Sequence, residues 1–416
     1  MATLVNKRIL LGITGGIAAY KSPDLVRRLR EGGAEVRCVL TRAAAEFITP
    51  LTLHAVSDQP VYQNLFGEQP TSEVVSGGEA KAMEHIELAR WADAVVVAPA
   101  SADFIARLAQ GRADDLLTTL CLAADAPVAI APAMNQQMWQ NPATQSNVET
   151  LRRNGLHLFG PGDGSQACGE VGPGRMLEPV DIARLTAGLF ESGELEGLGV
   201  VITAGPTWEA IDPVRGITNK SSGKMGYAIA AAAAEAGARV TLISGPTALA
   251  DPDRVKVVRV ASAQEMYDAV HTQVHGAQVF IAAAAVADYR PVAPATTKIK
   301  KKSEHLTLEL VRTPDILASV AALTPAPFAV GFAAETENVE ANARTKLAAK
   351  KVDLIAGNLV GVPDRGFEAE DNGLLLVEAT GVTELPIQPK TKLARALIHH
   401  VAQRLAARRG QTRERA

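Results

Sequence analysis

Short apolar segments alternate with longer stretches of helical periodicity along the whole chain. In the first half, the expected strands are Arg8–Gly12, Glu35–Thr41, Ala94–Ala98, Val128–Ala131 and Leu156–Phe159. The stretches with helical periodicity are Ile17–Glu31, Ala102–Ala109, Leu116–Ala123 and Asp181–Phe190. Short apolar strands that are separated by helices predict a parallel sheet covered on both faces.

The same alternation starts again after Glu191–Gly197, a polar segment that is typical of a linker. The expected strands of the second half are Gly199–Thr203, Arg239–Ile243, Val257–Val260, Gln278–Ala282, Phe328–Phe332 and Asp353–Ala356. The expected helices are Tyr227–Ala236, Ala263–His275, Pro314–Ala322, Val339–Lys350 and Lys392–Ala407. Because the halves do not repeat each other, we predict an α/β protein with two doubly wound sheets in tandem, in domains 1–190 and 191–416.

Composition narrows the classes of function. A chain of 416 residues with 47% hydrophobic and 4% aromatic residues is long enough for two or three domains. Its formal net charge of −3 gives no electrostatic reason to expect a nucleic acid or an anionic membrane as partner. No apolar run reaches the roughly eighteen residues that a membrane-spanning helix needs. We therefore expect a cytoplasmic protein.

The three cysteines have different settings. Cys38 lies in an expected strand and Cys121 in an expected apolar helix, so both are expected in the core. The wide spacing predicts neither a disulfide framework nor a zinc site. Cys168 instead lies in the glycine-rich loop Ala167–Met176, where a thiol has no packing role. Chemistry at Cys168 is our interpretation, and an exposed thiol on a loop is the alternative.

Each half also contains a glycine-rich turn before a helix. Gly12–Lys21 contains Gly15 and Gly16, and Ser221–Gly226 is the corresponding segment of the second half. Backbone N–H groups at a helix start can bind an anion. Neither turn has the GxGxxG or Walker A pattern, so phosphate binding at either turn alone stays open.

Several segments of the first half match a known pattern in order. They are Gly15–Lys21, His85–Leu88, Ala98–Asp103, Pro132–Trp139 and Ala167–Met176. These segments resemble the flavin-dependent cysteine decarboxylases. Segments of the second half resemble phosphopantothenate–cysteine ligases: Ile202–Trp208, Asp212–Arg215, Thr218–Gly226, Ala287–Pro291 and Lys298–Lys301. Over nearly its whole length, the chain thus resembles the bacterial bifunctional enzymes of coenzyme A biosynthesis.

The resemblance implies a role for each matched residue of the first half. FMN would serve as a recycled hydride carrier in a flavodoxin-like or Rossmann-like domain, held by Gly15, Gly16, Thr41 and Ser101. His85 is implied as the base and Asn135 as the anchor of the departing carboxylate. Cys168 is implied as the proton donor, on a flap that excludes water.

For the second half, the resemblance implies ligation of cysteine to 4′-phosphopantothenate with CTP, through an acyl-cytidylate, in a Rossmann-like domain. Lys298 is implied to stabilise the reacting phosphate together with Mg²⁺, and Asn219 and Arg215 to bind the acyl substrate. The residues implied to contact CTP are Ala283, Ala284, Asp288, Lys298, Pro314, Asp315, Ile316, Leu317, Phe332, Lys346 and Lys350. A homo-oligomer with trimeric flavin domains and dimeric ligase domains is implied as well.

One residue departs from the ligase pattern. Trp208 stands where the family usually has arginine, so a charge is lost at this position. Three alternatives remain: a non-catalytic FMN-binding regulator, a flavin prenyltransferase or flavodoxin-like redox protein, and an NAD(P)-dependent reductase for the second half. The set of His85, Asn135 and Cys168 argues against the first, and the Cys168 loop and the fused second domain argue against the second. The missing GxGxxG pattern argues against the third.

Overall fold

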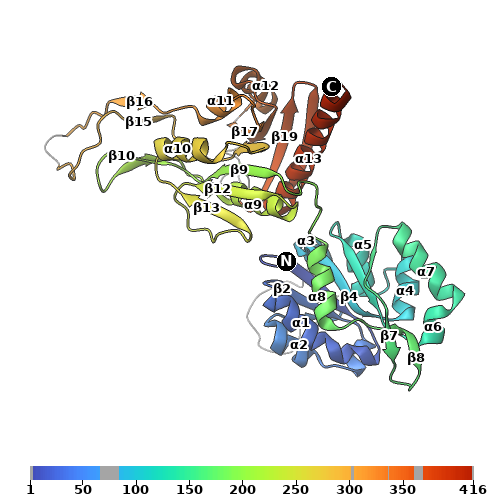
Figure 1. The fold of residues 1–416 in the computed structure, drawn as a ribbon. Helices are drawn as coiled ribbons and strands as arrows, with labels where there is room; N and C mark the ends of the chain where they lie inside the picture. The colour runs from blue at the N-terminus through green and yellow to red at the C-terminus, as the bar shows by residue number, and fades with distance from the viewer. Residues whose placement is uncertain (1–2, 66–83, 301–303, 336, 360–368, 415–416) are drawn as a thin grey trace. The chain divides into compact units, whose positions relative to one another are not determined.

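The computed structural model describes residues 3–65, 84–300, 304–335, 337–359 and 369–414 (Figure 1). The chain divides into two compact units, Met1–Glu191 and Ser192–Ala416, each with its own sheet and core. Among the helices in these ranges, none is long and apolar enough to cross a membrane.

The sheet of the first unit has the strand order β3-β2-β1-β4-β5-β6, and every pairing in it is parallel. Its strands are β1 (Arg8–Ile13), β2 (Glu35–Leu40), β3 (Val61–Tyr62), β4 (Ala94–Ala100), β5 (Val128–Pro132) and β6 (His157–Leu158). The order reverses between β1 and β4, which are neighbours in the sheet. Ligands of open α/β sheets bind at the carboxyl ends of the strands at such a switch point.

Helices cover both faces of this sheet. They are α1 (Ser22–Glu31), α2 (Pro50–Ser57), α3 (Glu84–Trp91), α4 (Ala102–Ala109), α5 (Leu116–Ala123), α6 (Gln136–Gln140), α7 (Pro142–Arg153) and α8 (Pro179–Gly188), with 3-10 turns η1 (Ile17–Lys21) and η2 (Ala44–Glu46). Leu25 of α1 and Ile182 of α8 pack in one core cluster, and Phe104 of α4 and Leu117 of α5 pack in the other. The prediction of a doubly wound parallel sheet is confirmed for this unit.

Some elements differ from the expectation. The segment 17–31 is divided, because the 3-10 turn η1 precedes α1, which begins at Ser22 with Pro23 in its first turn. Helix α7 was not expected, since only Val148 and Leu151 of its residues are buried. The loop around Cys168 joins two short antiparallel strands, β7 (Gly162–Ser165) and β8 (Val171–Arg175).

The sheet of the second unit has the order β13-β12-β9-β14-β17-β18-β19-β20. Its strands are β9 (Gly199–Ala204), β12 (Arg239–Ser244), β13 (Val255–Arg259), β14 (Val279–Ala282), β17 (Phe328–Glu335), β18 (Leu354–Leu359), β19 (Asp371–Glu378) and β20 (Gly381–Pro389). Pairing is parallel from β13 to β18, with the switch point between β9 and β14. The strands β19 and β20 are antiparallel additions that the sequence did not lead us to expect.

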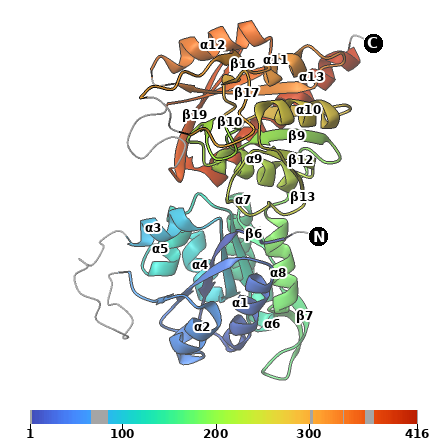
Figure 2. The same cartoon turned by 90° about the vertical axis from the view of Figure 1, so that its left-hand side faces the viewer.

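Helices cover both faces of the second sheet as well (Figure 2). They are α9 (Lys224–Glu235), α10 (Ala263–Gln273), α11 (Ile316–Ala321), α12 (Val339–Lys350) and α13 (Lys390–Glu414). Side chains of α9 and α13 pack in one core cluster, and those of α10, α11 and α12 in the other.

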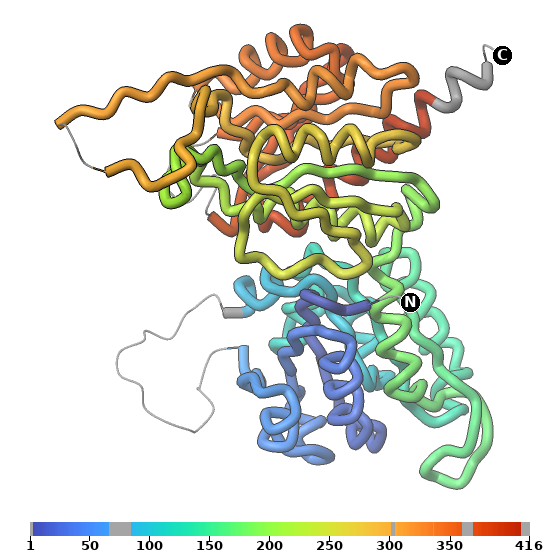
Figure 3. Tube along the Cα trace, turned by 60° about the vertical axis from the view of Figure 1, so that its left-hand side comes forward, coloured from blue at the N-terminus to red at the C-terminus, as the bar shows by residue number. Residues whose placement is uncertain are grey.

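Two excursions leave the carboxyl edge of this sheet. One is the hairpin of β10 (Trp208–Ala210) and β11 (Gly216–Thr218), and the other contains β15 (Tyr289–Pro291) and β16 (Leu310–Arg312). Figures 1 and 3 show both excursions reaching away from the sheet side by side. Lys298 and Arg215 are carried by these excursions.

Candidate active sites

A cavity of about 780 Å³ opens at the switch point of the first sheet. Gly15, Thr41 and Ser101 are among its lining residues, whereas Gly16, which precedes η1, is not. A Cβ atom on Gly15 would lie 2.5 Å from the Cβ of Ala43, so only glycine lets these two loops approach. The structure therefore brings most of the predicted cofactor residues together around one cavity.

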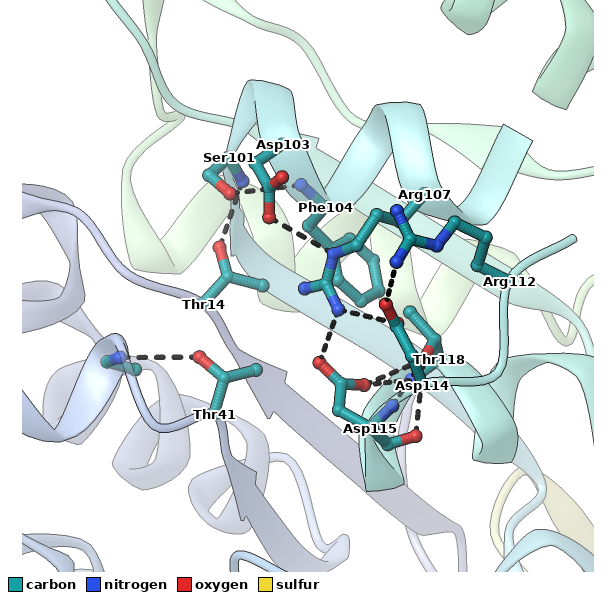
Figure 4. Close-up of polar contacts among 11 residues, drawn as sticks. Thr14, Thr41, Ser101, Asp103, Phe104, Arg107, Arg112, Asp114, Asp115 and Thr118 are labelled. Atoms are coloured by element: carbon teal, nitrogen blue, oxygen red, sulfur yellow. Dashed lines mark hydrogen bonds and ion pairs between the residues drawn. The ribbon is translucent and has the colours of Figure 1, made fainter. Parts of the chain in front are cut away.

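Thr14 fixes the two strands that border this switch point (Figure 4). Its hydroxyl donates a hydrogen bond to the carbonyl of Pro99 at 2.8 Å and accepts one from the N–H of Ser101 at 2.9 Å. The Ser101 hydroxyl in turn accepts from the N–H of Phe104 and caps α4. The ends of β1 and β4 are thus held at a fixed separation.

The sequence analysis missed a charged network on the cavity wall. Arg107 binds the carboxylates of Asp103, Asp114 and Asp115 at 3.1, 2.9 and 2.8 Å (Figure 4). These residues line the same cavity. Hydrogen bonding by Arg107 lowers the pKa of Asp114. The i,i+4 spacing of Asp103 and Arg107 was the available sequence signal, because it places both on one helix face.

Asn135 and Cys168 lie in contact, although they are far apart in the sequence. The Asn135 side-chain oxygen accepts from the N–H of Gln137 and caps α6. Its Nδ2 lies 3.4 Å from the Cys168 sulfur and donates to the carboxylate of Glu170 at 2.7 Å. The amide nitrogen of Asn135 and the thiol of Cys168 therefore face the same small region.

The hairpin β7–β8 is joined closely to the strand end that carries Asn135. Gly174 has a φ of +126°, and a Cβ there would clash with the carbonyl oxygen of Met134. The Gly174 carbonyl accepts from the N–H of Met134 at 2.9 Å. At the base of the hairpin, buried Lys21 binds Glu178 at 2.9 Å, and this bond lowers the pKa of Glu178.

The other two cysteines are buried, so their expected place in the core is confirmed. Burial raises the pKa of Cys38 and Cys121 to about 12, which leaves both as inert thiols near neutral pH. His85 is half-buried near the start of α3. Figures 1 and 2 show α3 and the hairpin β7–β8 on opposite sides of the unit. Within one chain, the helix that carries His85 and the hairpin that carries Cys168 therefore lie apart.

In the second unit, Asn219 lies at the switch point. It follows β11, and its Nδ2 donates to the carbonyl of Ala285 at 2.9 Å. Ala283 and Ala284 come directly after β14, where their N–H groups donate to the carbonyl and hydroxyl of Thr203. The predicted substrate residue and part of the predicted nucleotide segment are thus neighbours.

Two of the predicted nucleotide lysines, Lys346 and Lys350, already have oxygen partners. Lys346 is partly buried and donates to the carbonyl of Phe332 at 2.6 Å. Burial lowers the pKa of Lys346, while the carboxylates of Glu335 and Asp288 act in the opposite direction. Lys350, one helical turn further along α12, forms an ion pair with Asp315.

The remaining predicted CTP residues differ in exposure. Asp288 is exposed, and its carbonyl accepts from the N–H of Thr313, beside Pro314. The side chains of Ile316 and Leu317 are buried in the core, so only their backbone can reach a ligand. Asp315 caps α11 by accepting from the N–H of Ala318 at 3.0 Å.

Trp208 and Arg215 occupy the hairpin β10–β11. The Trp208 ring lies against the backbone of Gly216, so the large side chain covers the hairpin. Arg215 forms hydrogen bonds to Asp212 through Nε and Nη2 at 3.0 and 2.5 Å, and Nη2 also donates to the carbonyl of Ile299. Lys298, next to Ile299, is exposed, and Lys301 at the end of its motif lies outside the described residues.

The fold and the two sites define a class of protein. A doubly wound domain with a cofactor-sized cavity and a cysteine-bearing hairpin is followed by a doubly wound domain with Asn219 at its switch point. Residues 2–191 match the model of the Flavoprotein family. Residues 195–405 match that of the DNA/pantothenate metabolism flavoprotein C-terminal domain.

Relatives match over nearly the whole chain. The coenzyme A biosynthesis bifunctional protein CoaBC of Vibrio vulnificus (strain CMCP6) is 54% identical over 404 residues, which are 96% of this chain and 98% of that protein. The protein of the same name from Bacillus subtilis (strain 168) is 45% identical over 417 residues, 99% of this chain and 100% of that protein. A crystal structure of the C-terminal domain of CoaBC is 41% identical, covers 52% of this chain and all of its own (100%), with a TM-score of 0.45.

The chain belongs to the family of coenzyme A biosynthesis bifunctional proteins. It is an enzyme with a decarboxylase and a ligase activity, and its N-terminal unit is a flavoprotein domain.

Proposed function

We propose that residues 191–416 couple cysteine to 4′-phosphopantothenate with CTP, and that residues 1–190 decarboxylate the product to 4′-phosphopantetheine with FMN. The contact of Asn135 with Cys168 carries this proposal, since it joins a carboxylate-binding amide to a proton donor. Both lie in the unit whose switch point holds the cofactor-sized cavity. A redox protein without decarboxylation has no use for this pair.

The cavity fits FMN in size and in its donors. Its volume of about 780 Å³ is within the range of cofactor sites, and Gly15, Thr41 and Ser101 offer small or hydroxyl groups at the switch point. When bound, FMN supplies hydride acceptance from the substrate carbon next to sulfur and later hydride return. The oxidised substrate is a thioaldehyde, which can accept the electron pair that carbon dioxide leaves behind.

The residues of this chain handle the protons and the carboxylate. Asn135 holds the carboxylate through Nδ2, because its oxygen is occupied by the cap of α6. His85 removes the thiol proton at oxidation. Cys168 delivers a proton to carbon when the enethiol product is reduced, and the hairpin β7–β8 excludes water at that stage. Because α3, which carries His85, lies on the other side of the unit from the hairpin β7–β8, we assign His85 to the site of another copy in a trimer of flavin domains.

In the ligase unit, a carboxylate must attack the α-phosphate of CTP against strong charge repulsion. Lys298, Lys346 and Lys350 neutralise the phosphates, and Mg²⁺ that accompanies the triphosphate suits the exposed carboxylate of Asp288. Asn219 holds the acyl-cytidylate until cysteine attacks, next to the backbone of Ala283 and Ala284. We assign dimeric ligase domains and a cytoplasmic location to the protein.

The test uses the full-length protein and two variants, supplied with phosphopantothenate, cysteine and CTP. Lys298→Gln is expected to slow pyrophosphate release by about 10²–10³-fold, to a rate that can still be measured, yet still decarboxylate added phosphopantothenoylcysteine. Cys168→Ser is expected to release pyrophosphate and carbon dioxide and to accumulate the unreduced enethiol. The wild-type protein is expected to be yellow from bound flavin. Loss of both activities in each variant, or a colourless active protein, would contradict the proposal.

A further inference from the structure

The backbone of Ile299 is held on both sides by two side chains of the hairpin β10–β11. Its N–H donates to the Asp212 carboxylate at 3.1 Å, and its carbonyl accepts from Nη2 of Arg215 at 2.7 Å. A further backbone bond joins the N–H of Ala295 to the carbonyl of Ile211 at 2.9 Å. The segment that carries Lys298 is thus attached to the neighbouring excursion immediately beside that lysine.

Asp212 is the centre of this arrangement. Its side chain is fully buried, with an exposed fraction of 0%. Besides Ile299, it accepts from the N–H groups of Val214 and Arg215 at 2.8 and 2.9 Å and from the Arg215 guanidinium. A carboxylate with this many donors is held as an anion in one orientation, and the Arg215 bonds are the main reason that its pKa lies far below the usual range.

Lys298 itself has a different environment. Its side chain is exposed, and its reach is set by the backbone that carries it. The flexible four-carbon side chain of a lysine can reach a phosphate in many conformations. Fixing the adjacent peptide groups reduces the number of conformations that are available to it. Such preorganisation matters most when charge develops at the reacting phosphate.

We propose that Asp212, acting with Arg215, is the positioning residue for Lys298. Arg215 then serves as a clamp on the Ile299 peptide and not as a ligand of phosphopantothenate. This inference rests on the role given to Lys298 above.

A double-mutant cycle tests this inference in the full-length protein. Pyrophosphate release from CTP is measured for Asp212→Asn, Lys298→Gln and the double variant, at saturating phosphopantothenate. Asp212→Asn is expected to slow release about ten- to hundred-fold, because small misplacements of a catalytic group carry costs of this size. In the Lys298→Gln background, the same substitution is expected to change the rate less than about two-fold, since Asp212 acts only through Lys298.

A second variant covers the case in which Asp212→Asn does not fold. Arg215→Lys keeps the charge but loses the planar fork that spans Asp212 and Ile299. It is expected to lower kcat and leave the KM for phosphopantothenate within about two-fold, and its effect is also expected to vanish in the Lys298→Gln background. Asp268→Asn, an exposed aspartate on α10, is the matched control with normal kinetics. Decarboxylation of added phosphopantothenoylcysteine reports the integrity of every preparation.

Two results would overturn the inference without touching the proposed function. One is an additive loss, in which Asp212→Asn or Arg215→Lys slows pyrophosphate release by the same factor in the Lys298→Gln background as in the protein with Lys298. The other is a KM for phosphopantothenate raised ten-fold or more by Arg215→Lys, as expected for a substrate ligand. Normal pyrophosphate release by Lys298→Gln alone would instead remove the role of Lys298, and the inference with it.

Discussion

The two candidate sites differ in what their polar groups contact. In the first unit, Gly15, Thr41 and Ser101 surround a cavity and form few contacts with one another. In the second unit, the groups expected to bind the nucleotide hold other parts of the protein: Lys350 pairs with Asp315, and Lys346 with a backbone carbonyl. The first site is a preformed cavity, whereas in the second two of the predicted lysines are already bound to oxygen atoms of the protein.

This difference agrees with the two kinds of ligand. A cofactor that stays bound through many turnovers needs a permanent cavity, and a fixed framework such as Thr14 between β1 and β4 provides one. A nucleotide substrate must enter and leave in each cycle. The ion pair with Asp315 keeps Lys350 in place, and partly exposed pairs of this kind are weak enough for a triphosphate to displace them.

The largest expected effect separates two steps at the preformed site. His85→Asn is expected to lower decarboxylation by about 10²–10⁴-fold, with flavin left oxidised, because a positioned base supplies a factor of this size. Cys168→Ser is expected to release carbon dioxide but to leave the flavin reduced and the enethiol unreduced, since a serine hydroxyl is too weakly acidic. The flavin spectrum and mass analysis of the products distinguish the two variants.

The ligase reaction of the same preparations serves as the control, and it is expected to be unchanged. If Cys168→Ser forms the fully reduced thiol at the normal rate, Cys168 is only a hairpin residue. Neither His85→Asn nor Cys168→Ser alone is expected to form the fully reduced thiol at the normal rate. Mixing the two kinds of subunit is expected to restore formation of the reduced thiol if the site is shared between copies. No restoration after subunit exchange would contradict the trimer assignment.

The sequence predicted the parallel core of both sheets, because each strand there is a short apolar run with clear ends. Helices α4, α5 and α12 were predicted with the same bounds as observed, since each has a polar residue at its start or a regular apolar face. Strand β20 was missed because most of its residues are exposed at the sheet edge, so no apolar run marks it. The short strands β10, β11, β15 and β16 gave no periodic signal either.

The candidate sites show the same limit. Residues at or just beyond the carboxyl end of a strand, such as Ser101 and Asn135, could be placed from topology alone. The contacts of Asn135 with Gln166 and Glu170, and that of Asp212 with Ile299, could not, because they depend on how a hairpin folds back over the sheet edge. The resemblance implies that Arg215 binds the substrate, and this stays a prediction; nothing in the sequence indicated its contacts with Asp212 and Ile299.

The second-largest expected effect tests whether the first site needs the hairpin β7–β8 to be held in one position. Gly174→Ala is expected to lower decarboxylation about ten- to hundred-fold, because its Cβ would meet the Met134 carbonyl and a positive φ strains alanine. The shift would move Cys168 away from Asn135. Gly188→Ala is the matched control, since a Cβ there meets nothing within 4 Å. Normal decarboxylation by Gly174→Ala would show that the hairpin tolerates displacement.

A smaller effect concerns the buried lysine of the second site. Because burial lowers the pKa of Lys346, this lysine loses its proton at a lower pH than the ordinary value of 10.5. The kcat/KM for CTP is therefore expected to fall on the alkaline side, approaching ten-fold per pH unit above the pKa of the free enzyme. Lys346→Arg is expected to move this decline to higher pH, and Lys351→Arg, an exposed neighbour, is expected to leave it in place. An unchanged decline in Lys346→Arg would assign the titration to another group.

The smallest expected effect concerns the hydrogen bond between Asn135 and Glu170 in the first site. As in the second site, a group assigned to the ligand is bound to an oxygen atom of the protein itself. Glu170 places a carboxylate on Nδ2 of Asn135 at 2.7 Å, the group to which we assign the carboxylate of the substrate. Substrate binding must displace this internal carboxylate, and an exposed hydrogen bond of this kind contributes about 0.5–1.5 kcal/mol. Glu170→Gln is therefore expected to lower the KM for phosphopantothenoylcysteine about two- to ten-fold, and to have no such effect together with Asn135→Ala. Steady-state decarboxylation measures both. A KM that rises in Glu170→Gln would mean that Glu170 supports the hairpin, and the first site would then depend on an internal side-chain contact no less than the second.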